Sequence, residues 1–161
     1  MQTRRVSVTG ALIRDGLVLI VRRSEREEFL AGYYELPGGQ VEFGDDPARS
    51  IEREFLEETG LSVRALKPYH VLSYVLPADT HRFDIVYIVH TDERSDVVLS
   101  EEHDAYRWVS ETELDELIAT GAILMTEEMH AIINEGFAQS TSSTTRGAKE
   151  GSAPARPGDD R

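Results

Sequence analysis

The sequence predicts an α/β (α+β) fold, in which a β-sheet carries helices on its faces. Runs of aliphatic and β-branched residues alternate with segments that repeat apolar residues at helical spacing. Turn and cap residues bound each of these segments, and the sequence contains no internal repeat. A chain of 161 residues is long enough for one domain with its own hydrophobic core.

Five segments are rich in β-branched and aliphatic residues and therefore predict strands: residues 6–13, 17–22, 63–76, 83–91 and the shorter 106–109. Asp15-Gly16 separates the first two segments and is a strong signal for a hairpin. The third and fourth segments form a second strand pair, with Pro77-Ala78-Asp79 as the turn region.

The first predicted helix lies between Asp46 and Gly60. Asp46 is a good N-cap, Pro47 suits the first helical position, and Gly60 suits the left-handed residue just past the end. Leu61 is then expected to fold back against Phe55 or Leu56. An apolar face follows from the helical spacing of Ala48, Ile51 and Phe55.

Two further helices are expected near the end of the folded region. Ser110 caps a helix over residues 111–119, with Glu113 completing a capping box and Gly121 ending the helix. Thr126 or Glu127 opens the last helix. Its apolar stripe is more typical of core packing than of a cofactor site: Met129, Ile132, Ile133 and Phe137.

Three carboxylates share one side of the first helix. Glu54, Glu57 and Glu58 stand at spacings i, i+3 and i+4, which places neighbouring Cβ atoms roughly 5–6 Å apart. Like charges this close destabilise a helix, and a hard divalent cation such as Mg²⁺ reverses that cost. The helix is preceded by a turn at residues 36–39, where glycines permit positive φ and where a backbone carbonyl could complete an oxygen shell.

The stretch from Gly39 to Leu61 resembles the Nudix box. The matching residues stand at the spacing of that pattern: Gly39, Arg53, Glu54, Phe55, Glu57, Glu58, Gly60 and Leu61. One position departs from it, because Asp45 stands where the family has Glu. The alternative, a solvated acidic face on an ordinary helix, does not explain the glycine spacing.

The resemblance implies an α/β/α sandwich with a mixed β-sheet between helices, and a Mg²⁺-dependent hydrolase, with Mn²⁺ as a possible substitute. Water would attack phosphorus in the pyrophosphate linkage of a nucleoside diphosphate derivative. Glu54, Glu57 and Glu58 would be metal ligands, with the Gly39 carbonyl a weaker candidate and Glu57 also catalytic. By the same resemblance Arg53 orients the glutamates. Its alternative role is that of an exposed arginine in weak ion pairs.

Asp45 is expected to support the loop and Arg53, because it keeps the charge of the family's Glu. A second acidic cluster, Glu101-Glu102-His103-Asp104, precedes Trp108. It resembles the loop from which many Nudix enzymes bring an additional acid, with Glu102 the first choice and Glu101 the second. His103 is a candidate base because its ordinary pKa lies near neutrality. The competing interpretation is a solvated loop histidine.

Substrate contacts follow from two local patterns. Arg22 and Arg23 end a strand, where alternation sends them to opposite faces, and Arg23 is the candidate that enters the cleft. Tyr33 and Tyr34 can stack on a base or pack beneath the loop. We take Tyr34 as the binding candidate, with packing expected for at least one of the two.

Composition excludes several classes of protein. The net charge of −13 argues against a nucleic-acid partner, and no apolar run is long enough for a membrane span. The absence of cysteine excludes disulfides and thiolate zinc sites and agrees with a cytoplasmic address. We expect a domain over residues 1–137 and a disordered Ser/Thr/Gly/Pro-rich tail over 138–161. The family resemblance adds a possible homodimer.

Three hypotheses for function remain open. The first is hydrolysis of a nucleoside triphosphate by a MutT-like enzyme, with ADP-ribose, sugar nucleotides or dinucleoside polyphosphates as alternative substrates. Pro77 lies near a proline that ADP-ribose hydrolases carry, although a turn explains it equally well. The second is a nucleotide-binding regulatory module without activity, against which the intact glutamates argue. The third, an interaction module with an acidic face, leaves the glycine spacing unexplained.

Overall fold

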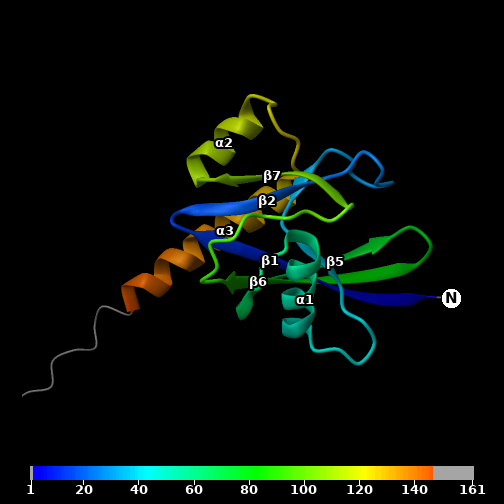
Figure 1. The fold of residues 1–161 in the computed structure, drawn as a ribbon. Helices are drawn as coiled ribbons and strands as arrows, with labels where there is room; N and C mark the ends of the chain where they lie inside the picture. The colour runs from blue at the N-terminus through cyan, green and yellow to red at the C-terminus, as the bar shows by residue number, and fades with distance from the viewer. Residues whose placement is uncertain (1, 147–161) are drawn as a thin grey trace, which may run out of the picture.

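The computed structural model describes residues 2–146 of the chain (Figure 1). The strands are β1 (Thr3–Arg14), β2 (Leu17–Arg23), β3 (Tyr34–Glu35), β4 (Gly38–Gln40), β5 (Arg64–Leu76), β6 (Thr80–His90) and β7 (His103–Val109). The helices are α1 (Pro47–Thr59), α2 (Glu111–Ala119) and α3 (Glu127–Arg146). All five predicted strands and all three predicted helices are present.

The strands form a mixed sheet in the order β3-β2-β1-β6-β5, with β4 paired to β1 and β7 paired to β2. The long pairing of β1 with β6 is parallel, and every other strand pair is antiparallel. The expected mixed sheet between helices is therefore confirmed.

The first hairpin is present but short. Asp15 and Gly16 adopt positive φ values of 53° and 76°, as the tight turn requires. Only two residue pairs join β1 to β2, next to this turn. The strands then diverge, so β1 pairs with β4 and β6 while β2 pairs with β3 and β7. The chain from β3 to β4 crosses between the two groups, and its Pro37 carbonyl accepts a hydrogen bond of 2.9 Å from the Gly10 amide.

Two hydrophobic clusters lie on opposite sides of β1 and β6, because alternate residues of a strand face opposite ways. Val8 and Leu12 pack with Ile51 and Phe55 of α1. Ala11 packs on the other side with residues of α2 and α3. In Figure 1, α1 and α3 accordingly lie on different sides of these strands.

The caps of α1 are those that the sequence predicts. Asp46 accepts a hydrogen bond of 3.1 Å from the Arg49 amide, and Gly60 adopts a φ of 72°. Leu61 is buried in the cluster that holds Phe55, as expected. The Ser110 cap and the bounds of α2 are also as predicted.

The segment 36–39 differs from the prediction. Gly38 and Gly39 belong to β4 rather than to a turn, and neither adopts a positive φ. Their lack of a side chain serves another purpose, because a Cβ at Gly38 would overlap with the Val8 carbonyl and a Cβ at Gly39 with the Glu54 carboxylate. Short strands such as β3 and β4 depend on their partners, so their own sequences carry little signal.

The last helix extends beyond the expected domain boundary at residue 137. Helix α3 continues to Arg146, so residues 138–146 are helical rather than part of a disordered tail. Hydroxyl groups of Ser140 and Thr141 donate to carbonyl oxygens of the preceding turn, and Lys67 donates to Gln139 with a distance of 2.9 Å. The rest of the predicted tail, residues 147–161, lies outside the described residues. Among the described helices, none is both long and apolar enough to cross a membrane.

Candidate metal and catalytic site

Glu58 is the most deeply buried of the three box glutamates, with 4% of the residue exposed. Its Oε2 accepts a hydrogen bond of 3.1 Å from the Gly38 amide in β4. Burial raises the pKa of the Glu58 carboxyl to about 9; the Gly38 amide opposes this shift, and Glu102 and Glu54 add to it. In the absence of a cation the carboxyl therefore holds a proton near neutral pH.

Glu54 lies one turn earlier on α1, with 13% of its side chain exposed. Its carboxylate lies directly against the backbone of Gly39. It occupies the space that a Cβ would fill if residue 39 were not glycine. Burial raises the pKa of the Glu54 carboxyl, Arg53 lowers it, and Glu57 and Glu102 raise it. Helix α1 and β4 thus form two walls of one acidic site.

Arg53 ties these elements together. Its Nη1 lies 3.1 Å from Glu54 Oε1 and 3.5 Å from Glu57 Oε1, while Nη2 donates to the Gln40 carbonyl at 3.2 Å. Burial acts against the charged guanidinium, but Glu54 and Glu57 more than compensate and raise the pKa of Arg53. Arg53 thus contacts two of the three box glutamates, and Glu57 is the most exposed of the three acids at 57% of its side chain.

Asp45 acts on Arg53 from a greater distance. Both residues line a hollow of about 500 Å³ beside the start of α1. The Asp45 carboxylate contributes to the raised pKa of Arg53, but the ion pairs of Arg53 with described residues are those to Glu54 and Glu57. Asp45 therefore acts on the charge of Arg53 electrostatically, without a direct ion pair between the two residues.

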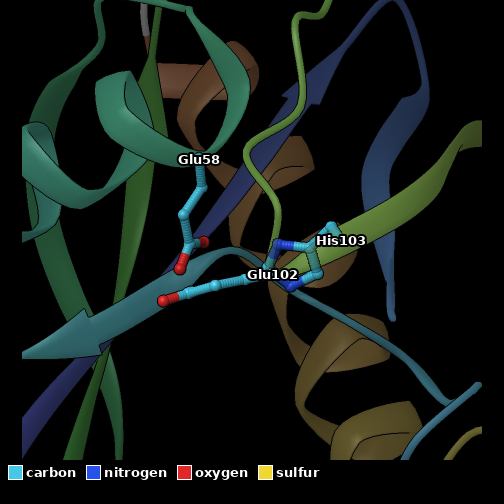
Figure 2. Close-up of side chains that lie close together, drawn as sticks. All are labelled: Glu58, Glu102 and His103. Carbon is cyan, nitrogen blue, oxygen red and sulfur yellow. The ribbon is translucent and has the colours of Figure 1, made fainter. Parts of the chain in front are cut away.

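Backbone hydrogen bonds hold the segment before the second acidic cluster against the end of α1. The Val98 amide donates to the Thr59 carbonyl at 2.9 Å, and the Ser100 amide donates to the Glu58 carbonyl at 3.2 Å. Glu102 follows in the same loop, and His103 begins β7. Figure 2 shows the Glu58 and Glu102 carboxylates pointing toward one another, with His103 beside them. A carboxylate oxygen of each glutamate and a ring nitrogen of His103 all lie within 4.8 Å of one another.

His103 is almost completely enclosed, with 3% of its side chain exposed. Its Nε2 lies 3.0 Å from Oε1 of Glu35, and Arg23 Nη1 lies 3.1 Å from the same oxygen. Arg23 also donates to the Phe29 carbonyl at 2.7 Å and to Glu27 at 3.0 Å. The expectation of a solvated loop histidine is thus wrong, and Arg23 is held in a network beneath the site.

Tyr34 is not brought to the glutamates. Its neighbour Glu35 faces the site, so alternation along β3 turns Tyr34 to the other face, where 7% of the residue is exposed. The hydroxyl of Tyr34 accepts a hydrogen bond of 3.3 Å from Arg107, and both residues line a separate hollow of about 310 Å³. Arg22 lies on that same face and pairs with Asp104 at 2.6 Å.

Two features fit a divalent cation. The donor set combines carboxylate oxygens with an imidazole nitrogen, which divalent metals accept. The buried polar atoms without a partner in the described residues include His103 Nδ1 and Ser100 Oγ, which lie within two positions of Glu102 in the sequence. Such orphaned atoms are costly unless a ligand or water satisfies them.

Sequence reasoning missed two groups of polar residues. Glu35 became visible only when the fold placed it beside His103, 68 positions along the chain. A second group lies on β1 and β6, where the buried Asp84 carboxylate accepts from Thr9 Oγ1 at 2.9 Å and its pKa is raised by burial. The alternation of Ser7 and Thr9 with Val6 and Val8 gave a signal for a polar face, but not for a buried carboxylate.

Comparison with known proteins places this geometry in a family. The profile of the NUDIX domain matches residues 3–129, which is most of the chain. The chain belongs to the NUDIX family. A solved structure of a MutT protein from Methanosarcina mazei Go1 superposes with a TM-score of 0.66 at 26% identity, over 89% of this chain and 96% of that one.

Curated relatives match over shorter stretches. A putative 8-oxo-dGTP diphosphatase 2 of Mycobacterium tuberculosis is 42% identical over 62 residues, which is 38% of this chain and 43% of the relative. An octanoyltransferase of Myxococcus xanthus is 32% identical over 113 residues, 68% of this chain and 30% of the relative. An ADP-ribose pyrophosphatase of Methanocaldococcus jannaschii is 38% identical over 56 residues, 35% of this chain and 32% of the relative. The matches thus span less than half the length of these relatives.

Proposed function

We propose that this NUDIX protein is a divalent-metal-dependent pyrophosphohydrolase that acts on a nucleoside diphosphate derivative, with a nucleoside triphosphate as the first candidate substrate. The observation that carries the proposal is the buried Glu58 carboxyl, which faces Glu102 and lies on the Gly38 amide. A buried acid with a raised pKa in a cluster of acids is costly to the fold unless it serves a ligand.

The box residues would divide the work of a metal site. Glu54, Glu57, Glu58 and Glu102 offer carboxylate oxygens, and the Gly39 carbonyl is an additional candidate. Mg²⁺ is the expected cation, with Mn²⁺ as a substitute. When bound, such a cation supplies positive charge to phosphoryl oxygens and makes water a better nucleophile. Arg53 keeps Glu54 and Glu57 in position through its ion pairs.

Proton removal from the attacking water needs an acceptor near the cation. Glu57 and Glu102 are the proposed candidates because both carry exposed carboxylates beside the buried ones. His103 is the third candidate from the sequence. Arg23 is the sequence candidate for a contact to substrate phosphate, but its guanidinium nitrogens bind Glu27, Glu35 and the Phe29 carbonyl, so such a contact would require Arg23 to leave these partners.

The choice of substrate rests on the relatives. Proteins named MutT and 8-oxo-dGTP diphosphatase favour a nucleoside triphosphate. The ADP-ribose pyrophosphatase favours ADP-ribose or a sugar nucleotide as the alternative. Pro77 does not decide between them, since it lies in the turn between β5 and β6, where Ala78 and Asp79 adopt positive φ.

A module that binds nucleotide without cleaving it is the alternative of another class. The full set of box glutamates and the ordered Arg53 favour the enzyme, because binding alone does not require an arranged cluster of carboxylates. A cytoplasmic location and a homodimer remain predictions from sequence and family.

The test is a panel of nucleoside triphosphates, ADP-ribose, sugar nucleotides and dinucleoside polyphosphates, each with Mg²⁺ or Mn²⁺. We expect turnover of at least one nucleoside triphosphate and its loss in EDTA. Glu57→Gln and Glu58→Gln should each lower turnover by at least about 100-fold while the circular dichroism spectrum is retained. Absence of turnover on the whole panel would favour the binding module. Near-normal rates in both variants would exclude the proposed metal ligands.

A further inference from the structure

The unusual residue of the site is His103, which begins β7. Its Nε2 is occupied by Glu35, while its Nδ1 is buried and has no partner among the described residues. An imidazole nitrogen enclosed to this degree is normally satisfied by a hydrogen bond or a ligand. Two carboxylates, from Glu58 and Glu102, offer oxygens within 4.8 Å of a ring nitrogen of this histidine.

The partner on the other side of the ring is equally informative. A histidine that binds a metal almost always donates its second ring N–H to a carboxylate, a carbonyl or water. Glu35 provides such a carboxylate at 3.0 Å from Nε2. An ionised carboxylate only accepts, so a neutral ring must carry its proton on Nε2, and this leaves the lone pair on Nδ1.

Glu35 is itself held in place. Arg23 Nη1 lies 3.1 Å from the same Oε1 that faces His103, and the remaining nitrogens of Arg23 bind the Phe29 carbonyl and Glu27. The order of contacts is therefore Arg23, Glu35, His103 and then the carboxylates of Glu58 and Glu102. This is the arrangement of a ligand with an orienting shell behind it.

We propose that His103 Nδ1 is a nitrogen ligand for the divalent cation that Glu58 and Glu102 bind, with Glu35 and Arg23 as positioning residues. The inference rests on the proposed function for the presence of a cation in this site. It assigns His103 to ligation rather than to proton transfer. A mixed oxygen and nitrogen donor set binds Mn²⁺ and later transition metals better than an all-oxygen set would, relative to Mg²⁺.

The direct test is pulsed electron paramagnetic resonance of the full chain loaded with Mn²⁺ alone. We expect ¹⁴N modulation from a directly coordinated imidazole in the unmodified protein, and its loss in His103→Gln. His90→Gln is the matched control, because His90 is half-exposed and pairs only with Asp92 among the described residues. That control should keep the signal. Absence of ¹⁴N coupling in the unmodified protein would overturn the proposal, whatever the variants do.

Calorimetric titration provides the second measurement. His103→Gln should weaken Mn²⁺ binding by about 10- to 100-fold and Mg²⁺ binding by less, so the Mn²⁺/Mg²⁺ affinity ratio falls. Glu35→Gln keeps an acceptor for Nε2 and should weaken Mn²⁺ binding less than Glu35→Ala. Equal losses for both metals in His103→Gln would contradict nitrogen ligation.

The two proposals fail in distinguishable ways. If Mn²⁺ shows ¹⁴N coupling but no substrate is turned over, the nitrogen ligand is supported and the proposed enzyme activity is excluded. If a substrate is turned over but Mn²⁺ is bound solely through oxygen, the proposed enzyme activity is supported and the nitrogen ligand is excluded. If His103→Gln fails to fold, two decisive measurements remain: the spectrum of the unmodified protein, and the comparison of Glu35→Gln with Glu35→Ala.

Discussion

Glu58 combines a buried position with an ionisable group, and this has a measurable consequence for stability. Burial raises the pKa of its carboxyl from 4.5 to about 9 in the folded, metal-free protein. Between these two values the folded state keeps a proton that the unfolded state releases. The free energy of unfolding should therefore fall as pH rises through this window, by up to about 1.4 kcal/mol per pH unit.

Urea unfolding in EDTA from pH 5 to pH 8.5 checks this prediction. Glu58→Gln, which mimics the protonated acid, should remove this contribution and be the more stable protein at the alkaline end. Glu116→Gln on α2 is a control that removes one exposed carboxylate, and it should retain the slope. A wild-type profile parallel to that of Glu58→Gln would show that burial does not raise the pKa of this carboxyl.

Arg53→Lys preserves the charge and removes the planar fork. Because one guanidinium bridges Glu54, Glu57 and the Gln40 carbonyl, a lysine ammonium cannot reproduce all three contacts. We expect kcat to fall by about 10- to 100-fold, as for other residues that orient metal ligands. Steady-state kinetics at saturating Mg²⁺ measure the change. An unchanged kcat would show that Arg53 forms only weak surface ion pairs and does not orient the glutamates.

Individual residues of the site were predictable to the extent that their neighbours lie close in sequence. Glu54, Glu57 and Glu58 share one helix, so their spacing alone brought them together. Glu102 followed from the family pattern. Glu35 did not, because its role depends on contacts with Arg23 and His103 that only the assembled sheet creates.

At the scale of elements, β4 offers a matched pair of substitutions. Gly38→Ala would push a Cβ into the Val8 carbonyl, which is backbone, so β4 must shift away from β1. Gly39→Ala would meet the Glu54 carboxylate, the end of a flexible side chain that can move. We expect Gly38→Ala to lose stability and Gly39→Ala to lose Mn²⁺ affinity and activity with a smaller loss of stability.

Thermal unfolding and Mn²⁺ titration of both variants separate the two effects. The assignment predicts a lower Tm for Gly38→Ala than for Gly39→Ala, and weaker Mn²⁺ binding by Gly39→Ala than by the unmodified protein. A Gly39→Ala protein with normal Mn²⁺ affinity would show that Glu54 does not need its position against β4.

Elements with local signals were predicted closely, and elements without them were not. Asp46, Pro47 and Gly60 define α1 through contacts within the helix itself, so its bounds follow from sequence. The two- and three-residue strands β3 and β4 form only because β2 and β1 lie beside them. The end of α3 was misjudged because serine and threonine suggested disorder, whereas their hydroxyls bond to the preceding turn of the helix.

At the scale of the whole molecule, the proposed cation joins parts of the chain that no single element contains. Its ligands would come from α1, from the loop before β7 and from His103 at the start of β7, so binding should stabilise the entire fold. Mn²⁺ at 100 times its Kd should add about 2.7 kcal/mol, which is roughly 5–10 °C in Tm for a domain of this size.

Differential scanning calorimetry with and without Mn²⁺ measures this shift. Glu58→Gln and Glu102→Gln should each reduce it, while Glu116→Gln should leave it intact. An equal shift in all three variants would indicate that Mn²⁺ binds elsewhere on this acidic protein.

The parallel pairing of β1 with β6 also sets an order of events during synthesis. Thr3 meets Thr80, 77 positions later, so β1 finds this partner only after most of the sheet has left the ribosome. Helix α1 can form earlier because its caps are local. At that stage β1, against which α1 packs, still lacks its neighbour β6. Such distant pairings close late and slow folding. A nascent chain that ends before β6 should therefore carry all three box glutamates and yet have no assembled site in which to hold a cation.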